Sequence, residues 1–257
     1  MYTDLEATLH DAFWQGFDEE LPLLETFLAR HPGTALELGC GSGRLLLDLL
    51  GKGYLMEGLD NSPEMLAICQ ESAEKSDLSP VLHQADMADF QTGATYSAIV
   101  IPAFTLQLLD YQKVSTLLET TQRHLHPGGG LYLTTFIPWA EITGELEEGE
   151  EFLDHETYLP DGSSAKCHTT FQIDRLSQRL TREHRYEMLD TDGNPTDSST
   201  STHHLTWFWP RELTNLLTAA GYQIDQTIQD FNPAEHNENG QIITIFASLP
   251  VEEEVAI

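Results

Sequence analysis

Apolar and polar residues alternate at helical spacing over residues 5–28, which predicts one or two amphipathic helices at the start of the chain. The period then changes, because residues 34–38 form a short apolar run typical of a buried strand. A glycine-rich turn over 39–43 follows, and a second apolar helical stretch begins at Arg44. The pattern therefore predicts a strand, a tight turn and a helix in direct succession.

Strands continue to alternate with helices along the chain. We expect further strands over 54–60, 81–84, 98–101, 130–136, 222–228 and 242–249, and helices over 63–72, 111–125 and 210–221. Ser62 predicts an N-cap, since Pro63 follows it at the first helical position. This alternation predicts an α/β fold with a seven-stranded, mostly parallel sheet and helices on both faces.

Residues 139–209 interrupt the alternation. Segment 141–161 carries nine acidic residues and no Lys or Arg. Strand formers then dominate 168–176, 179–189 and 203–209, with a two-residue connection at Ser177 and Gln178, a turn at 190–195 and a polar loop at 197–202. We expect an inserted antiparallel β subdomain over 139–209 that covers the acceptor site, between the two parts of the main domain, 1–138 and 210–257.

The composition limits the classes of partner. The chain has 257 residues with 42 Asp and Glu against 12 Lys and Arg, a formal net charge of −30. Phosphate backbones are held mostly by Lys and Arg, so we expect no nucleic-acid partner. A field of this sign attracts cations, although solubility or adaptation to salt also accounts for a charge spread along the whole chain.

The N-terminus and the cysteines bear on location and metal content. The segment Met1–Glu6 has neither a positive patch nor an apolar core, and no stretch reaches the ~18 apolar residues that span a bilayer, so we expect a cytoplasmic protein without membrane contact. Cys40, Cys69 and Cys167 are an odd, widely spaced set with no CxxC pair, which predicts neither disulfides nor a metal site.

The glycine turn indicates a nucleotide-like cofactor, because glycine lets the backbone approach a ligand and direct N–H groups at it. Its spacing does not fit the dinucleotide pattern G-x-G-x-x-G/A, since Arg44 stands at the third position of that pattern. A nicotinamide oxidoreductase is therefore disfavoured. The Walker pattern for nucleoside triphosphates is also absent from the sequence.

Residues 36–43, Leu-Glu-Leu-Gly-Cys-Gly-Ser-Gly, resemble the first motif of the class I S-adenosylmethionine-dependent methyltransferases. The resemblance continues at Asp60, 17 residues after Gly43, where the family holds the ribose, at Asp86 and Met87, where it holds adenine, and at 125–130, the entry to the fifth strand. It implies a Rossmann-like fold and donor-binding residues Glu37, Gly39, Cys40, Gly41, Gly43, Asp60, Asn61, Asp86, Met87 and Ile101.

The resemblance further implies S-adenosylmethionine as methyl donor, S-adenosylhomocysteine as product and no metal. Methyl transfer is an in-line displacement with a good leaving group, so it needs alignment and exclusion of water, and we assign no catalytic residue. The acceptor is expected above the ends of the fourth and fifth strands, where open α/β sheets bind ligands. Candidate contacts are Phe104, Gln107, Trp139 and Trp207, the last of which equally fits a core position.

The inserted sheet resembles that of small-molecule N- and O-methyltransferases, including sugar-amine N-methyltransferases. We therefore predict methylation of a small molecule, with nitrogen slightly favoured over oxygen, and leave a homodimer open. The alternative is a donor-binding regulatory or protein-docking module without turnover, for which the acidic segment 141–161 would dock a basic partner. Methylation of Lys- or Arg-rich peptides is a third reading of the acidic surface.

Overall fold

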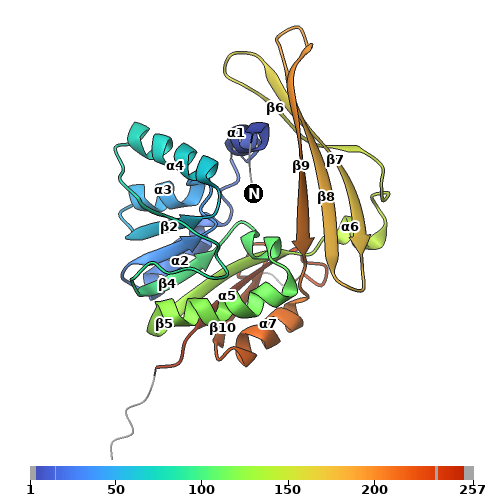
Figure 1. Ribbon diagram of the computed structural model, residues 1–257. Coiled ribbons are helices and arrows are strands. Elements are labelled where there is room, and N and C mark those ends of the chain that lie inside the picture. Colours follow the sequence, from blue (N-terminus) through green and yellow to red (C-terminus); the bar gives the residue numbers. More distant parts are fainter. Residues whose placement is uncertain (1–3, 15, 235–236, 252–257) are drawn as a thin grey trace, which may run out of the picture.

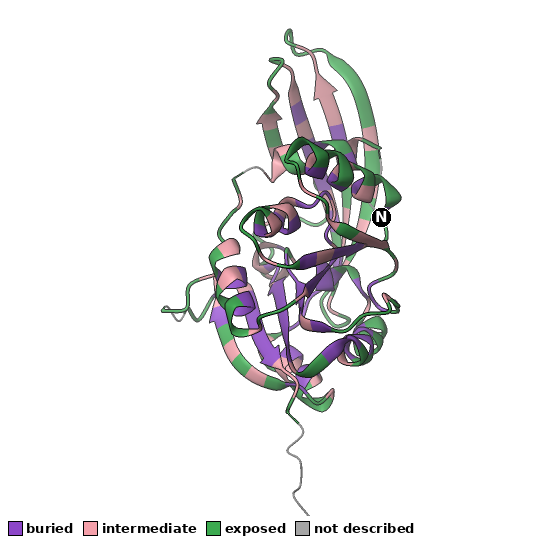
Figure 2. Ribbon diagram, turned by 90° about the vertical axis from the view of Figure 1, so that its left-hand side faces the viewer, coloured by how far each residue is buried: buried purple, intermediate pink, exposed green. Residues whose placement is uncertain are grey.

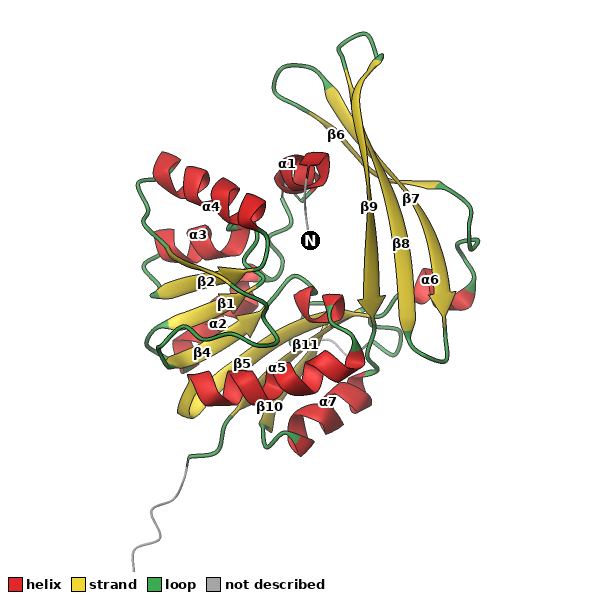
Figure 3. Ribbon diagram, in the orientation of Figure 1, coloured by secondary structure: helices red, strands yellow, loops and turns green. Residues whose placement is uncertain are grey.

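Two β-sheets organise the computed structural model, which describes residues 4–14, 16–234 and 237–251 (Figure 1). Seven strands form one sheet in the order β10-β11-β5-β4-β1-β2-β3, and four form a second sheet in the order β6-β7-β8-β9. Helices cover both faces of the larger sheet (Figure 3). The predicted fold class is confirmed. The expected main domain also includes residues 1–3 and 252–257, which lie outside the described residues.

The larger sheet follows the predicted alternation closely. Its strands are β1 (Ala35–Leu38), β2 (Met56–Asp60), β3 (Val81–Gln84), β4 (Tyr96–Ile101), β5 (Leu125–Phe136), β10 (Gln223–Gln229) and β11 (Ile242–Ser248). β1 pairs in parallel with β2 and β4, whereas β11 runs antiparallel between β5 and β10. The carboxyl ends of β1, β2, β3, β4 and β5 therefore meet at one edge.

The helices that the pattern predicts are present: α1 (Asp4–Phe13), α2 (Leu21–Arg30), α3 (Arg44–Gly51), α4 (Pro63–Lys75), α5 (Tyr111–His124) and α7 (Pro210–Ala219). Two short helices were not predicted, the 3₁₀ helix η1 (Thr105–Leu108) and α6 (Trp139–Thr143). Ser62 caps α4 as predicted, because its hydroxyl accepts a hydrogen bond from the Met65 amide at 3.3 Å. None of the described helices is long and apolar enough to cross a membrane.

The smaller sheet departs from the prediction in three places. Its strands are β6 (Phe152–Tyr158), β7 (Ser164–Asp174), β8 (Arg179–Leu189) and β9 (Pro195–Thr206). Residues 197–202, expected as a polar loop, lie inside β9, while Trp207 and Trp209 follow the strand instead of belonging to it. β6 lies in the acidic segment, where no strand was expected. Pairing with β8 and β7 overrides the weak local propensity of these polar stretches.

Two apolar clusters hold the larger sheet between its helices. One joins β1, β4 and β5 to α5 and α7, and the other joins the opposite face to α2 and α3. The central strand β4 is buried on both faces from Ala98 to Ile101, as expected for a strand covered by helices on each side. Figure 2 shows this burial concentrated in the larger sheet, while the far end of the smaller sheet is exposed.

The smaller sheet has one face directed at the rest of the molecule, which we call the inner face. Side-chain alternation and the regular β7–β8 register define it by Cys167, Thr169, Phe171, Arg182, His184, Tyr186, Ser201 and His203. Helix α1 contacts β9 and β6, and Leu9 of α1 packs against Cys167 and Tyr186 (Figure 1). Near the other end of this face, Phe171 packs with residues of α6.

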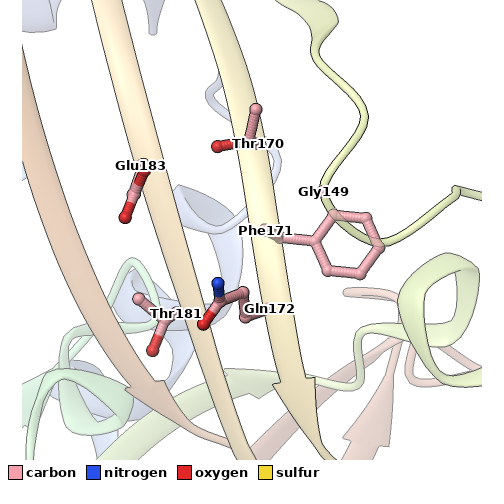
Figure 4. Close-up of a pocket in the computed structure, with 6 residues that line it drawn as sticks. All are labelled: Gly149, Thr170, Phe171, Gln172, Thr181 and Glu183. Atoms are coloured by element: carbon pink, nitrogen blue, oxygen red, sulfur yellow. The ribbon is translucent and has the colours of Figure 1, made fainter.

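The opposite, outer face of this sheet carries a shallow hollow. Its lining residues are Gly149, Thr170, Phe171, Gln172, Thr181 and Glu183. Figure 4 shows the four polar side chains on one side of the strands and the Phe171 ring directed away from them. The two faces of the sheet therefore differ: one is closed by α1 and α6, and the other is solvent-facing.

Candidate functional site

The glycine turn lies at the carboxyl end of β1, beside the end of β2. Gly39, Gly41 and Gly43 have φ angles of 71°, 54° and 87°, the left-handed region that L side chains rarely adopt. A Cβ atom on Gly39 would also overlap the methyl group of Thr105, and one on Gly43 would overlap the Cys69 sulfur. Both the conformation and the close approach of neighbouring residues therefore require glycine at these two positions.

Asp60 at the end of β2 ties the turn to the next helix. Its Oδ2 accepts a hydrogen bond from the Gly41 amide at 2.9 Å, and its Oδ1 accepts one from the Ser62 amide at 2.8 Å. Each carboxylate oxygen has two lone pairs, so both oxygens keep acceptor capacity for a ligand. The position and chemistry suit a grip on vicinal hydroxyl groups.

Glu37 lies within β1, two residues before the turn. It is 3% exposed, and its Oε2 is buried without a hydrogen-bond partner among the residues that the structure describes. Burial raises the pKa of Glu37 to about 8, with further contributions from the nearby carboxylates of Glu20 and Asp60, while Arg44 opposes the shift. A cationic ligand at this oxygen would supply the missing partner. The orphaned acceptor and the glycine turn together fit a cationic nucleoside such as S-adenosylmethionine.

The remaining predicted donor residues lie along the same edge. Asp86 follows β3; its Oδ1 accepts from the Ala88 amide at 2.9 Å and its Oδ2 pairs with Lys113 at 3.2 Å. Met87 and Ile101 are buried at the ends of β3 and β4, and Asn61 is exposed beside Asp60. The Cys40 side chain is buried in the core, its amide donates to the Leu59 carbonyl at 3.0 Å, and its carbonyl accepts from the Gly43 amide at 2.9 Å.

Aromatic rings connect the end of β5 with the segment that follows α1. The Phe104 ring lies 5.2 Å from that of Phe136 and 6.5 Å from that of Phe17, while the Arg182 guanidinium lies 5.7 Å from the Phe136 ring centroid. Phe104, a predicted acceptor contact, is partly exposed. The inner face of the smaller sheet and the carboxyl edge of the larger sheet thus meet at Phe136.

The other predicted acceptor contacts have partners within the protein. Gln107 is 1% exposed, donates to the Phe136 carbonyl at 3.0 Å and accepts from the Phe136 amide at 2.7 Å. The Trp139 indole donates to the Gly240 carbonyl at 3.2 Å. Trp207 is 2% exposed and packs with Phe171 and its neighbours. Of these four residues, Phe104 and Trp139 are partly exposed, whereas Gln107 and Trp207 are buried.

Comparisons with known proteins match the part of the chain that forms this edge of the larger sheet. A family described as "Methyltransferase domain" matches residues 35–129, the stretch from β1 into β5. The dTDP-3-amino-3,6-dideoxy-alpha-D-glucopyranose N,N-dimethyltransferase of Streptomyces fradiae is 25% identical over 97% of the chain and 92% of its own length. Residues 35–129, which include the glycine turn and Asp60, are thus a methyltransferase domain. A putative methyltransferase of Bacillus subtilis, YqeM, is 27% identical over 79% of the chain and 78% of its own length.

Solved structures share the fold of this methyltransferase. An S-adenosylmethionine-dependent methyltransferase from Clostridium acetobutylicum superposes with a TM-score of 0.79 at 16% identity, covering 95% of this chain and 97% of that one. The sugar N-methyltransferase KedS8 from Streptoalloteichus superposes with a TM-score of 0.73 at 19% identity, over 98% and 94% of the two chains. Both alignments extend through the inserted sheet of the methyltransferase.

Sequence analysis missed a buried carboxylate that contacts β5 and the loop after β4. Glu20, fully buried, accepts hydrogen bonds from the Tyr132 hydroxyl at 3.0 Å, the Thr134 hydroxyl at 2.5 Å and the Ala103 amide at 3.0 Å. Burial raises the pKa of Glu20, although the hydrogen bonds from these three donors act to lower it. Ala103 and Phe104 both have positive φ, 52° and 63°, so Glu20 supports a strained loop. Nothing local distinguishes Glu20 from the acidic residues around it.

One set of potential metal ligands occurs among the described residues of the methyltransferase. The ligand atoms of Asp154, Cys167 and His184 lie within 4.8 Å of one another. The Thr169 hydroxyl donates to Asp154 and accepts from the His184 ring, each at 2.8 Å. Burial lowers the pKa of His184 to about 4, so its ring is neutral at pH 7. This hydrogen-bonded chain accounts for the proximity of the three side chains without an ion.

Proposed function

We propose that this methyltransferase transfers the methyl group of S-adenosylmethionine to a small-molecule acceptor, with an amine nitrogen favoured over a hydroxyl oxygen. The observation that carries the proposal is the combination at one edge of the larger sheet: a glycine turn, the Asp60 carboxylate and the unpartnered oxygen of Glu37. These are the groups that a cationic nucleoside needs.

Each donor-side residue has a proposed role that follows from its position. Asp60 holds the ribose hydroxyls, while the backbone of Gly39 and Gly41 lines the donor. Glu37 neutralises positive charge at the methionine end, since its buried oxygen has no other partner. Asp86 accepts from the exocyclic amine of adenine, and the buried Met87 covers the ring.

Methyl transfer requires the protein mainly to position the donor and the acceptor. When bound, S-adenosylmethionine supplies an electrophilic methyl group on a sulfonium leaving group. The chain must hold the acceptor in line with that methyl group and exclude water from it. The partly exposed Phe104 and the aromatic ring of Phe136 offer an apolar wall for the acceptor, at the place where Arg182 of the inserted sheet arrives.

The inserted segment, residues 139–209, supports a small molecule as the methyl acceptor. Its inner face is turned towards the larger sheet and is covered in part by α1, which favours a small acceptor over an extended peptide. The Streptomyces fradiae relative is named as an N,N-dimethyltransferase of an amino sugar, and this name supports nitrogen as the acceptor atom. We propose that 139–209 forms the acceptor-side subdomain.

The pKa of Glu37 predicts how donor affinity depends on pH. Because the pKa is raised to about 8, the carboxyl group is mostly protonated below pH 8 and must lose its proton to pair with a cation. Donor affinity should therefore rise about tenfold from pH 6 to pH 7. Calorimetry at several pH values checks this, with Glu37→Gln as the control that should flatten the dependence. A flat wild-type profile would contradict the proposed role of Glu37.

Donor binding and turnover test the proposed function directly. Calorimetry with S-adenosylmethionine should give a dissociation constant in the micromolar range, and methyl-labelled donor should yield S-adenosylhomocysteine together with a labelled amine from a panel of small amines and alcohols. No donor binding at hundreds of micromolar would remove the assignment. Donor binding without any product would instead favour a regulatory module.

A further inference from the structure

One carboxylate of the lead-in helix α1 lies buried against the inner face of the inserted sheet. Glu6 is 3% exposed. Its Oε1 accepts hydrogen bonds from the Tyr186 hydroxyl at 2.9 Å and the Ser201 hydroxyl at 3.0 Å, and contacts the His203 ring nitrogen Nε2 at 2.6 Å. Three partners from β8 and β9 thus converge on a single oxygen of this carboxylate.

The second oxygen of Glu6 has a different environment. Among the described residues, Glu6 Oε2 is buried and has no hydrogen-bond partner, which is unfavourable for a charged group. Burial by itself would raise the pKa of Glu6, but the hydrogen bonds from His203, Tyr186 and Ser201 lower it below its usual value. Glu6 is therefore an anion with one oxygen held by hydrogen bonds and the other buried without a partner among the described residues.

Other unpartnered polar atoms lie around the same face. Among the described residues, the Arg182 Nε and the Trp207 indole nitrogen are also buried without a hydrogen-bond partner. Arg182 is on the inner face, ion-paired with the buried Glu141, and Trp207 directly follows β9. Buried polar groups in native proteins nearly always have partners, so unpartnered atoms along this face are consistent with a polar ligand.

Helix α1 links this face to the donor turn. Asp11, five residues after Glu6, accepts a hydrogen bond from the Ser42 hydroxyl of the glycine turn at 2.5 Å. Five residues correspond to about 7.5 Å along a helix axis. Glu6 is thus within the length of a small molecule from the donor turn, and Figure 1 shows α1 between the helices of the larger sheet and β9.

The charges of this region indicate the class of acceptor. Within the described strands β6–β9, Arg182 is the only Lys or Arg on the inner face, and it is already paired with Glu141. Residues 1–29, which include α1, contain seven acidic residues and no Lys or Arg. An electronegative surface with an unpartnered carboxylate favours an amine and disfavours an acceptor that carries a diphosphate.

We propose that Glu6 Oε2 binds the nitrogen of the acceptor, which is a primary or secondary amine without a phosphate group. This inference rests on the proposed function. The neutral amine donates an N–H to Oε2 and its lone pair forms the new N–C bond, while the pair of the breaking S–C bond stays on sulfur. Positive charge develops on nitrogen, so the interaction of the Glu6 carboxylate with the acceptor is stronger in the transition state than in the ground state. The extra proton of the ammonium product then leaves to solvent.

This arrangement also favours nitrogen over oxygen as the acceptor atom. A hydroxyl group must lose its proton to become a good nucleophile, whereas an amine attacks as the neutral base. The lowered pKa of Glu6 makes it a weak base but a good counter-ion. Tyr186, Ser201 and His203 are positioning residues, because they hold Oε1 and so aim Oε2.

The test compares carboxylate-to-amide changes at Glu6, which α1 holds against the inner face of the inserted sheet, and at Glu183 on the outer face. Glu6→Gln should lower kcat/KM at least 50-fold for the best amine of a panel in which each amine has a matched alcohol. Glu183→Gln, on the solvent-facing side, should change it less than twofold. Glu6→Asp, which keeps the charge, should recover part of the activity, and Tyr186→Phe should lower it several-fold. Donor affinity and thermal unfolding are measured for every variant.

The outcomes distinguish this inference from the proposed function. Unchanged donor binding with a selective loss of amine turnover in Glu6→Gln supports the inference. Amine turnover within threefold of wild type in Glu6→Gln would overturn it while leaving the proposed function intact. Product from the alcohols only, or from no amine although the donor binds, would overturn it as well. Absence of donor binding in the wild-type protein would instead overturn the proposed function.

Discussion

Asp60→Ala is expected to weaken binding of S-adenosylmethionine at least 100-fold. Asp60 holds the Gly41 and Ser62 amides and, in the proposed function, two ribose hydroxyls. Hydrogen bonds to a charged group contribute about 1.5–3 kcal/mol each, so the loss of two ligand contacts corresponds to about 10²- to 10⁴-fold in affinity. Calorimetry with the donor measures the effect directly.

Two variants control this experiment. Asp60→Asn keeps an acceptor oxygen and should have a smaller effect, about tenfold. Asp89→Ala removes an exposed carboxylate from the loop after β3 and should leave donor affinity unchanged. If Asp60→Ala bound the donor within tenfold of the wild-type protein, the ribose would not be held at the end of β2.

Glu20→Ala is expected to lower the free energy of unfolding by about 3–5 kcal/mol. The change leaves the Tyr132 hydroxyl, the Thr134 hydroxyl and the Ala103 amide without their acceptor in a buried site, and each such group costs about 1–3 kcal/mol. Urea denaturation measures the loss. Where the protein still folds, the loop at Ala103 and Phe104 should relax and raise the KM for the acceptor.

The neighbouring residue offers a matched control. Glu19 is an exposed carboxylate next to Glu20, and Glu19→Ala should change stability by less than about 0.5 kcal/mol. Glu20→Gln keeps the shape but places an N–H group where a donor already points, so an intermediate loss is expected. A Glu20→Ala protein as stable as the Glu19→Ala protein would show that this buried network contributes nothing net.

The two positions illustrate how much of the site could be predicted. Asp60 was found because it stands at the end of a predicted strand, at a spacing from the glycine turn that matches a known motif. Glu20 and Glu6 gave no such signal, since residues 1–29 hold seven acidic side chains with no distinguishing pattern. Gln107 was proposed as an acceptor contact, and its engagement with the Phe136 backbone could not be inferred from sequence.

The amino-acid sequence by itself determined the larger sheet and the glycine turn, because hydrophobic periodicity and turn chemistry act over neighbouring residues. Only the tertiary structure decided which carboxylates became buried. Glu6 meets Tyr186 across 180 residues of chain, and β9 forms over a Ser- and Thr-rich stretch because β8 pairs with it. Burial and strand pairing depend on distant segments. The proposed acceptor site therefore has no local sequence pattern, whereas the proposed donor site has one.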